Sequence, residues 1–245
     1  MNLTKDAIQF MKDWFEKNGG QNAVIGISGG KDSTVSAAIC KEALGKEHVY
    51  GIMMPNGVQR DINDSKKVIE FLGINGYEIN INAAFINIIS QIMDNFHIAE
   101  VSDQTKFNLP PRLRMSTLYA VAQTLVGGRV INTSNLCEAY VGWGTLFGDT
   151  VGDVAPLAGL TCSEIREIGH DLGLPACLVD KVPADGLTDK SDEDNLGFKY
   201  ADVEAVIEGK DVPEEVAQKI AERHAMSAFK RNALNIPRFK KTAKI

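Results

Sequence analysis

The pattern of hydrophobic and polar positions predicts strands that alternate with helices along the first half of the chain. Ala23–Ile27 is a short apolar, β-branched run of the kind that forms a strand buried on both faces. Thr4–Lys17 and Asp61–Leu72 carry apolar residues at helical spacing, and glycines follow each of them. We expect strands at 23–27, 48–54, 77–81 and 129–132, and helices at 4–17, 34–43, 61–72, 83–96, 112–126, 161–173, 201–208 and 213–227.

This alternation predicts an α/β fold, a parallel sheet with helices on both faces. The 245 residues suit a single domain, 1–245. In such sheets the ligand lies at the carboxyl ends of the strands, near a point where the strand order reverses. Ser28 and Thr133 each follow a predicted strand directly, so we expect them at one pocket.

Several segments interrupt the regular pattern. Leu109–Pro111 is expected to break the chain before the long helix 112–126. Thr133–Asp153 is rich in glycine and aromatic residues, which predicts a loop that forms a site and contains a short helix. Asp180–Phe198 is long and charged and lacks apolar periodicity, so we interpret 180–198 as a mobile lid with Gly186 as its hinge. A basic C-terminal tail follows from Phe229.

Composition excludes several classes of partner and compartment. The net charge of −6 and the isoelectric point near 5.3 argue against a nucleic-acid surface. No run approaches the roughly 18 apolar residues of a membrane span, and the first residues do not resemble a signal peptide. Four widely spaced cysteines without a C-x-x-C pair argue against a zinc site or a thiol-transfer pair and favour reduced thiols in the cytoplasm.

The stretch Ser28-Gly29-Gly30-Lys31-Asp32-Ser33 has the order strand, glycine-rich turn and helix start, which presents backbone N–H groups to a phosphate. Ile25 and Asp32 stand where the Walker pattern needs a glycine and a hydroxyl residue, and the Rossmann glycine spacing is absent. The alternative is an ordinary turn in which Asp32 or Ser33 caps the helix.

Two acidic residues are candidate metal ligands. Asp32 beside phosphates would be repelled unless a cation lay between them, which points to Mg²⁺. Glu138, after Thr133–Cys137, is a second candidate oxygen ligand. No pattern typical of a protein nucleophile is visible. The four histidines lie outside every motif and are expected to serve in packing: His48, His97, His170 and His224.

The phosphate loop resembles that of the N-type ATP pyrophosphatases, and further stretches resemble the ammonia-dependent NAD synthetases of that superfamily. In order along nearly the whole chain, the matching stretches are 27–34, 54–61, 108–115, 132–138, 148–153, 181–185 and 200–212. The resemblance implies a Rossmann-like fold of the adenine nucleotide alpha hydrolase type. It also implies a C–N ligase that amidates deamido-NAD with ammonia and ATP, giving NAD, AMP and pyrophosphate through an adenylylated intermediate.

The same resemblance assigns roles to individual residues. Asp32 and Glu138 would bind Mg²⁺, and Asp32 and Lys181 would act in catalysis. Arg112, Asp153 and Lys230 would hold deamido-NAD. The residues implied in ATP binding are Ile27, Ser28, Gly29, Gly30, Lys31, Asp32, Ser33, Thr34, Thr133 and Lys181.

The resemblance further implies a homodimer with deamido-NAD bound partly across the interface. The long helix has apolar residues on more than one face, which suits a second covered side. These residues are Leu113, Met115, Leu118, Tyr119, Ala122, Leu125 and Val126.

Three positions depart from the commoner family pattern, and rival functions stay open. Leu146 replaces a frequent lysine, Lys199 a threonine or serine, and Phe229 a histidine. One alternative is another N-type ATP pyrophosphatase that amidates or thiolates a different substrate, such as a GMP synthetase or a tRNA-modifying enzyme. The other motifs of those enzymes, their catalytic cysteine pairs or their basic RNA surface are not visible in this sequence. The other alternative is a nucleotide-binding regulator without catalysis.

Overall fold

One parallel sheet organises the part of the chain that the structure, a computed structural model, describes: residues 2–59, 61–180 and 191–231. Its strand order is β3-β2-β1-β4. The strands are β1 (Asn22–Gly26), β2 (Val49–Met53), β3 (Asn75–Glu78) and β4 (Gly128–Val130). Beyond β4, an isolated parallel bridge pairs Ile131 with Val154. β1 is therefore an interior strand, with β2 on one side and β4 on the other.

The connections place a reversal of strand order at the carboxyl end of β1. From β1 the chain passes through α2 (Lys31–Leu44) and the short helix η1 (Lys46–His48) to β2, and through α3 (Ile62–Leu72) to β3. Then α4 (Asn82–Phe96) and α5 (Asp103–Thr124) carry it back to β4, on the opposite side of β1. A ligand site is expected where the segments after β1 and β4 diverge.

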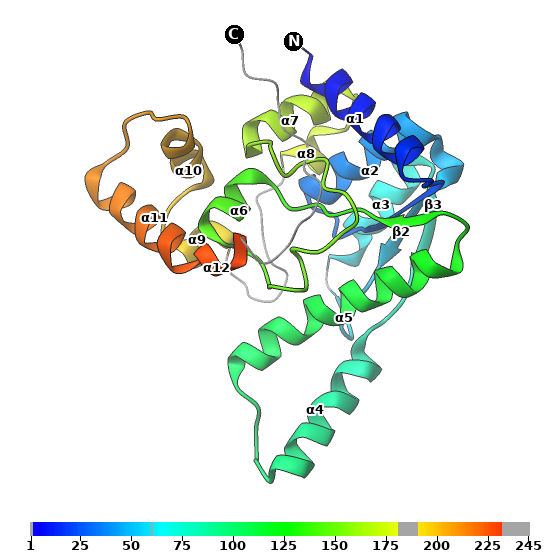
Figure 1. Cartoon of the computed structure of the whole chain (residues 1–245). Coiled ribbons are helices and arrows are strands. Elements are labelled where there is room, and N and C mark those ends of the chain that lie inside the picture. Colours follow the sequence, from blue (N-terminus) through cyan, green and yellow to red (C-terminus); the bar gives the residue numbers. More distant parts are fainter. Residues whose placement is uncertain (1, 60, 181–190, 232–245) are drawn as a thin grey trace.

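Helices cover both faces of the sheet, which confirms the predicted fold class (Figure 1). Ala23, Ile25 and Ile27 alternate onto one face, where they join the main core with α1 (Leu3–Lys17), α2 and α7 (Cys162–Asp171). Val24 points to the other face and packs in a second core with Ile52, Val130 and residues of α5. The continuous apolar run of β1 thus reflects a strand buried on both sides.

The C-terminal helices form a group beside the sheet (Figure 1). They are α6 (Leu136–Val141), α9 (Asp192–Leu196), α10 (Tyr200–Ile207), α11 (Glu214–Met226) and α12 (Ala228–Arg231). The short helix α8 (Ala176–Val179) instead packs against α2 and α7. α10 packs against α6, α7 and α11. Their shared core contains Cys137, Val141, Cys162, Phe198, Tyr200, Val203 and Ile220.

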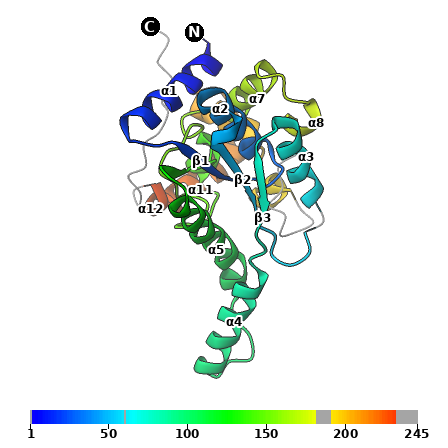
Figure 2. The same ribbon diagram turned by 90° about the vertical axis from the view of Figure 1, so that its right-hand side faces the viewer.

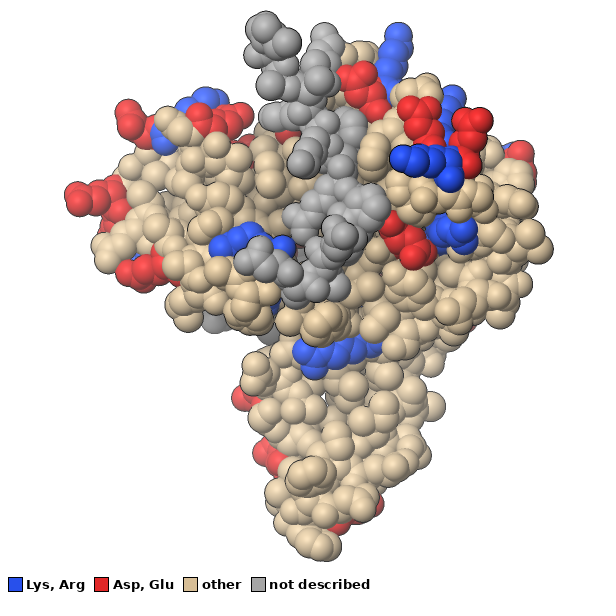
Figure 3. Space-filling view, in the orientation of Figure 1, with Lys and Arg blue, Asp and Glu red and all other residues tan. Residues whose placement is uncertain are grey.

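The α4–α5 hairpin projects from the rest of the molecule (Figures 1 and 2). α4 has no buried residue, and its main packing partner is α5. Large apolar side chains are exposed on and near this hairpin, including Ile86, Phe107 and Phe96, which is 74% exposed. On the face that Figure 3 shows, the projecting lobe carries few charged side chains. The hairpin therefore offers an apolar surface.

The predicted chain break at Leu109–Pro111 is wrong, because α5 begins at Asp103 and includes Pro110 and Pro111. The Ser102 side chain caps it by accepting a hydrogen bond from the Thr105 N–H. A proline inside a helix costs about 3 kcal/mol, since it removes one N–H and crowds the preceding turn. Both prolines are buried, and Pro111 lies against Gly148 of the 145–153 loop, so tertiary packing offsets that cost.

Two further expectations change. The third strand begins and ends earlier than predicted, and residues 191–198 of the expected lid contain α9, whose first turn is capped by Ser191. Residues 181–190, including Lys181 and Gly186, lie outside the described residues, so the lid stays a prediction.

The apolar residues of the long helix are also arranged differently from the expectation. Leu113, Leu118, Tyr119, Ala122 and Leu125 all pack in the core that α5 shares with the sheet. Among the described residues, Val126 just after α5 is exposed, and α4 carries the exposed apolar side chains Ile86 and Phe96. Among the described helices, none is long and apolar enough to cross a membrane.

Candidate functional site

The loop after β1 folds tightly over the start of α2. Gly29 has φ +82°, and a Cβ there would lie 2.9 Å from the Cβ of Asp64, so both backbone conformation and space require glycine. Gly30 is the N-cap of α2, which means that neither Asp32 nor Ser33 caps the helix. The hydroxyls of Ser33 and Thr34 donate to the Gly30 carbonyl at 3.1 and 2.7 Å.

Hydroxyl groups hold the rest of this loop. The N–H of Gly30 donates to Ser28 Oγ at 3.2 Å, and the N–H of Ser28 donates to Ser33 Oγ at 3.3 Å. The loop therefore leads directly into the N-terminal turn of α2, where N–H groups and the helix dipole attract anions. All eight predicted ATP-binding residues from Ile27 to Thr34 belong to this one unit.

Lys31 and Asp32 form an ion pair inside the site. The ammonium of Lys31 donates to both carboxylate oxygens of Asp32, at 2.9 and 2.7 Å. The side chain of Lys31 is 3% exposed and that of Asp32 is 21% exposed. An amide N–H of Asn135 also donates to Asp32 Oδ1, at 3.3 Å. Asp32 thus joins the loop after β1 to the start of α6.

Glu138 reaches the same place from α6. A capping box fixes it: the Glu138 N–H donates to Asn135 Oδ1 at 2.9 Å, and the Asn135 N–H donates to Glu138 Oε2 at 3.2 Å. Burial raises the pKa of Glu138 well above its ordinary value, and the charge of Asp32 raises it further, while Lys31 opposes both effects. Asp32 and Glu138 therefore lie within electrostatic reach of each other.

The charges of this cluster favour a further cation. Burial lowers the pKa of the Lys31 ammonium, but neighbouring groups, the carboxylate of Asp32 first among them, outweigh it, so the net shift is upward. One buried ammonium faces two carboxylates, whose oxygens are the ligands that Mg²⁺ prefers. The donor set fits Mg²⁺.

The remaining predicted residues are spread around this centre. Thr133 follows β4 and its bridge, at the sheet edge next to β1. Asp153 accepts from the Val130 N–H at 2.7 Å and from the Tyr119 hydroxyl at 3.5 Å. Arg112 is exposed and its Nε donates to the Leu146 carbonyl at 3.3 Å. Lys181 lies outside the described residues.

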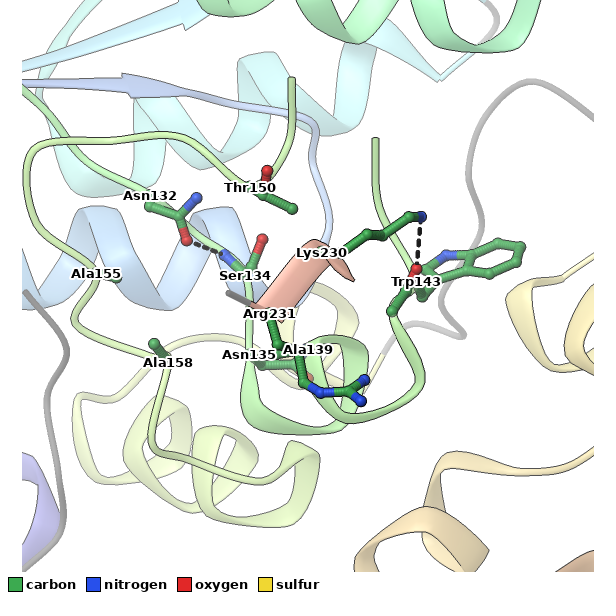
Figure 4. Close-up of a pocket in the computed structure, with 11 residues that line it drawn as sticks. Asn132, Ser134, Asn135, Ala139, Trp143, Thr150, Ala155, Ala158, Lys230 and Arg231 are labelled. Carbon is green, nitrogen blue, oxygen red and sulfur yellow. Dashed lines mark hydrogen bonds between the residues drawn. The ribbon is translucent and has the colours of Figure 1, made fainter. Parts of the chain in front are cut away.

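Lys230 lines a pocket between α6, α12 and the loops around Asn132 and Thr150 (Figure 4). Its ammonium donates to the carbonyls of Gly142 and Gly144 at 2.8 and 2.7 Å. Burial lowers the pKa of Lys230, and the charge of Arg223 lowers it further. Arg112 and Asp153 are not among the pocket-lining residues, so the described part of the chain does not gather the three predicted substrate ligands in one cavity.

Sequence reasoning missed three residues of this region. Asn135 bonds to Asp32, and its place three residues before Glu138 is a capping-box signal that could have shown it. Arg114 is mostly buried and its Nε donates to the Met54 carbonyl, at the carboxyl end of β2. Arg231 joins α12 to α6 through the Tyr140 carbonyl. Arg114 has no local signal, because its partner is distant in sequence, whereas Arg231 also donates to the nearby Ser227 Oγ and His224 carbonyl.

Comparison with known proteins identifies the family. The sequence profile of the NAD synthase family matches residues 3–234. The chain belongs to the NAD synthase family. The NH(3)-dependent NAD(+) synthetase of Alkaliphilus metalliredigens is 33% identical over 230 residues, which cover 91% of this chain and 93% of that protein.

Solved structures agree on the fold. An NMN synthetase from Francisella tularensis superposes with a TM-score of 0.87 at 32% identity, and the match covers 97% of this chain and 98% of that one. The NAD+ synthetase from Burkholderia pseudomallei gives a TM-score of 0.78 at 26% identity, over 94% and 88% of the two chains. These findings support an ammonia-dependent NAD synthetase, a ligase that forms a C–N bond, and confirm the predicted family and fold.

Proposed function

We propose that this chain amidates deamido-NAD with free ammonia, consuming ATP and releasing AMP and pyrophosphate through an adenylylated intermediate. The observation that carries the proposal is the meeting of the loop after β1 with α6, where Asp32 contacts Asn135 and faces Glu138. This arrangement lies at the reversal of strand order and combines an anion-binding helix start with two carboxylates.

The chemistry follows from the poor reactivity of a carboxylate toward ammonia. Attack of the pyridine carboxylate on the α-phosphate of ATP forms a mixed anhydride and expels pyrophosphate, and ammonia then displaces AMP. Negative charge grows on the phosphates in the first step. The N–H groups at the start of α2 and the ammonium of Lys31 suit the stabilisation of that charge. We assign the same role to Lys181, and the ATP contact of Thr133 to the neighbouring sheet edge.

Asp32 and Glu138 would hold Mg²⁺. When bound, the ion would neutralise phosphate charge and relieve the repulsion between the two carboxylates. The ammonium of Lys31, which now bonds to Asp32, would then be free to turn toward a phosphate oxygen. We assign Arg112, Asp153 and Lys230 to deamido-NAD, and we keep the cytoplasm as the proposed location.

A turnover assay tests the proposal. Pyrophosphate release should require ATP, Mg²⁺, deamido-NAD and an ammonium salt together. A nucleotide-binding regulator would release none, and an amidating or thiolating enzyme for another substrate would not depend on deamido-NAD. Glutamine freed of ammonia should not replace the ammonium salt, because glutamine hydrolysis needs an activated cysteine, and three of the four cysteines are buried.

A second candidate substrate is the corresponding mononucleotide, deamido-NMN. The match to an NMN synthetase, with a TM-score of 0.87, favours it. Comparing kcat/KM for deamido-NMN and deamido-NAD under the same conditions decides between them. A preference of more than tenfold for deamido-NMN would assign the chain to NMN formation while leaving the ligase chemistry unchanged.

The active unit is proposed to be a homodimer joined through the α4–α5 hairpin, whose side chains Ile86, Phe96 and Phe107 are exposed in the described chain. Phe96→Asp should convert the dimer to monomers in light scattering, because Phe96 is 74% exposed on α4. Phe71→Asp on α3 is the matched control, since Phe71 is also exposed but lies away from the hairpin. A monomeric wild-type protein with full activity would overturn this part of the proposal.

A further inference from the structure

Two cysteines and a glutamate from three helices meet beneath the proposed active site. Cys137 lies on α6, Cys162 begins α7, and Glu204 lies on α10. Their sulfur and carboxylate oxygen atoms all lie within 4.8 Å of one another. Both cysteines are almost completely buried. These residues lie far apart in the sequence, so no local motif predicts that they meet.

The ligand types and distances suit a thiophilic metal ion. Zn²⁺ binds thiolate sulfur at about 2.3 Å and carboxylate oxygen at about 2.0–2.2 Å, usually with tetrahedral geometry. Ligand atoms of such a site are separated by roughly 3.3–3.8 Å, a separation that follows from those bond lengths. The present atoms, all within 4.8 Å of one another, lie at most about 1 Å beyond the upper end of this range. Hard cations such as Mg²⁺ prefer oxygen ligands and would not select two sulfurs.

A second layer of contacts already orients the carboxylate. The Ser163 N–H donates to Glu204 Oε1 at 2.7 Å, and the Ser163 hydroxyl donates to Oε2 at 2.9 Å. Hydrogen bonds of this kind fix ligand orientation in metal sites. Two thiolates and a carboxylate would exceed the charge of a divalent ion by one, and the buried ammonium of Lys31 lies within electrostatic reach of Cys162 to offset it.

The competing explanation is that Glu204 only caps α7 while a thiol fills the space beside it. In that case the two hydrogen bonds from Ser163 explain the orientation of both Glu204 oxygens. It does not account for the second sulfur, because Cys137 Sγ lies 4.0 Å from Glu204 Oε1, a long distance for a sulfur hydrogen bond. A weakly bonded pair of buried thiols next to an oriented carboxylate is the donor set of a metal site.

We propose that Cys137, Cys162 and Glu204 form a binding site for one thiophilic divalent cation of the Zn²⁺ class, distinct from the oxygen site of Asp32 and Glu138. The ion would tie α6, α7 and α10 together. Because Cys137 directly precedes Glu138, occupancy would stabilise the helix that carries this proposed Mg²⁺ ligand.

Cobalt binding to the full, reduced chain tests the site. Co²⁺ should be added in the presence of excess Mg²⁺, which occupies the oxygen site. A near-ultraviolet thiolate-to-cobalt charge-transfer band should grow to one equivalent per chain and disappear when Zn²⁺ is added. Bound zinc should also raise the melting temperature. This readout does not depend on amidation activity, so it succeeds or fails separately from the proposed function.

Variants locate the site. Cys137→Ala, Cys162→Ala and Glu204→Gln should each weaken zinc binding by at least tenfold, and the two cysteine variants should lose most of the band. Cys177→Ala is the matched control, because Cys177 is exposed on α8 and should leave the band unchanged. Circular dichroism checks folding, and Glu204→Gln serves if a cysteine variant does not fold.

No charge-transfer band in the folded, reduced wild-type chain would overturn the proposal. So would a band that survives in Cys137→Ala and Cys162→Ala, or one lost in Cys177→Ala. A Cys137–Cys162 disulfide that resists reduction would also overturn it, since the oxidised pair offers no thiolate.

Discussion

Replacing Asp32 and Glu138 by their amides should affect folding stability in opposite directions while lowering turnover in both cases. Asp32→Asn and Glu138→Gln each preserve side-chain shape and remove one negative charge. The two carboxylates differ in their surroundings: Asp32 holds the Lys31 ammonium through both oxygens, whereas burial and the charge of Asp32 work against ionisation of Glu138. The two substitutions look equivalent in the sequence, but the structure predicts different effects on folding stability.

Asp32→Asn leaves the Lys31 ammonium, with a side chain 3% exposed, without its charged partner. Removing one member of a buried ion pair costs about 3–5 kcal/mol. Asp32 itself is partly open to water, and Glu138 still opposes the charge of Lys31, so we expect the lower end of that range, about 3 kcal/mol.

Glu138→Gln keeps an acceptor oxygen for the Asn135 N–H and removes a charge that burial disfavours. We expect stability without Mg²⁺ to change by about 1 kcal/mol or less, in the stabilising direction. Because the pKa of Glu138 is raised in the folded chain, its contribution is fully present below the ordinary carboxyl pKa and is lost as pH rises through the raised pKa. The advantage of the variant should thus grow with pH over that interval.

Urea unfolding without Mg²⁺ and nucleotide, repeated across pH, measures these free energies, and pyrophosphate release at saturating Mg²⁺ measures turnover. Both variants should lose turnover by at least a hundredfold, since each lacks a charge that the cation needs. If the two variants destabilise the chain equally, the inference that the two carboxylates contribute differently to stability is refuted. Near wild-type turnover in either variant would refute the role of that residue as a metal ligand.

Three further changes test single features of the site. Gly29→Ala should cost about 1–3 kcal/mol in urea unfolding and raise the KM for ATP, because of its positive φ and its contact with Asp64; an unchanged midpoint would contradict this. Asn135→Ala should cost about 1 kcal/mol through loss of the α6 cap and lower kcat by misplacing Asp32, whereas Asn135→Asp should restore the cap but not kcat. Lys230→Met should raise the KM for deamido-NAD and also lower the melting temperature by removing two carbonyl contacts; a lowered melting temperature at unchanged KM would refute the substrate role.

The phosphate loop could be predicted because its signals are local. A buried strand, two glycines and a helix start follow one another between Ala23 and Thr34, and the structure keeps that order. The helix predicted at 161–173 has a local signal of the same kind, because Thr161 and Glu164 form a capping box at the start of α7. The alternation of strands and helices predicted the sheet. Its third strand, which has few apolar residues, begins and ends earlier than predicted.

Features decided by distant packing could not be predicted. Pro110 and Pro111 would break an isolated helix, but both are buried, and Pro111 lies against Gly148, far along the chain. Cys137 and Cys162 lie apart in sequence and meet because α6 and α7 share a core with α10. Lys230 matched a family position, but its two carbonyl partners near Gly142 have no sequence signal. In each case the contact that decides the structure joins residues far apart in the sequence.

Capping and metal binding by Glu138 need not exclude each other. A carboxylate has two oxygens, and the capping bond from the Asn135 N–H uses Oε2, so Oε1 can serve as the ligand. The amide of Asn135 similarly uses its oxygen for the Glu138 N–H and its nitrogen for Asp32. One capping box therefore fixes both carboxylates relative to each other. Such fixed placement is what a cation with strict oxygen geometry requires, and it explains why a short helix of six residues stands at this point of the fold.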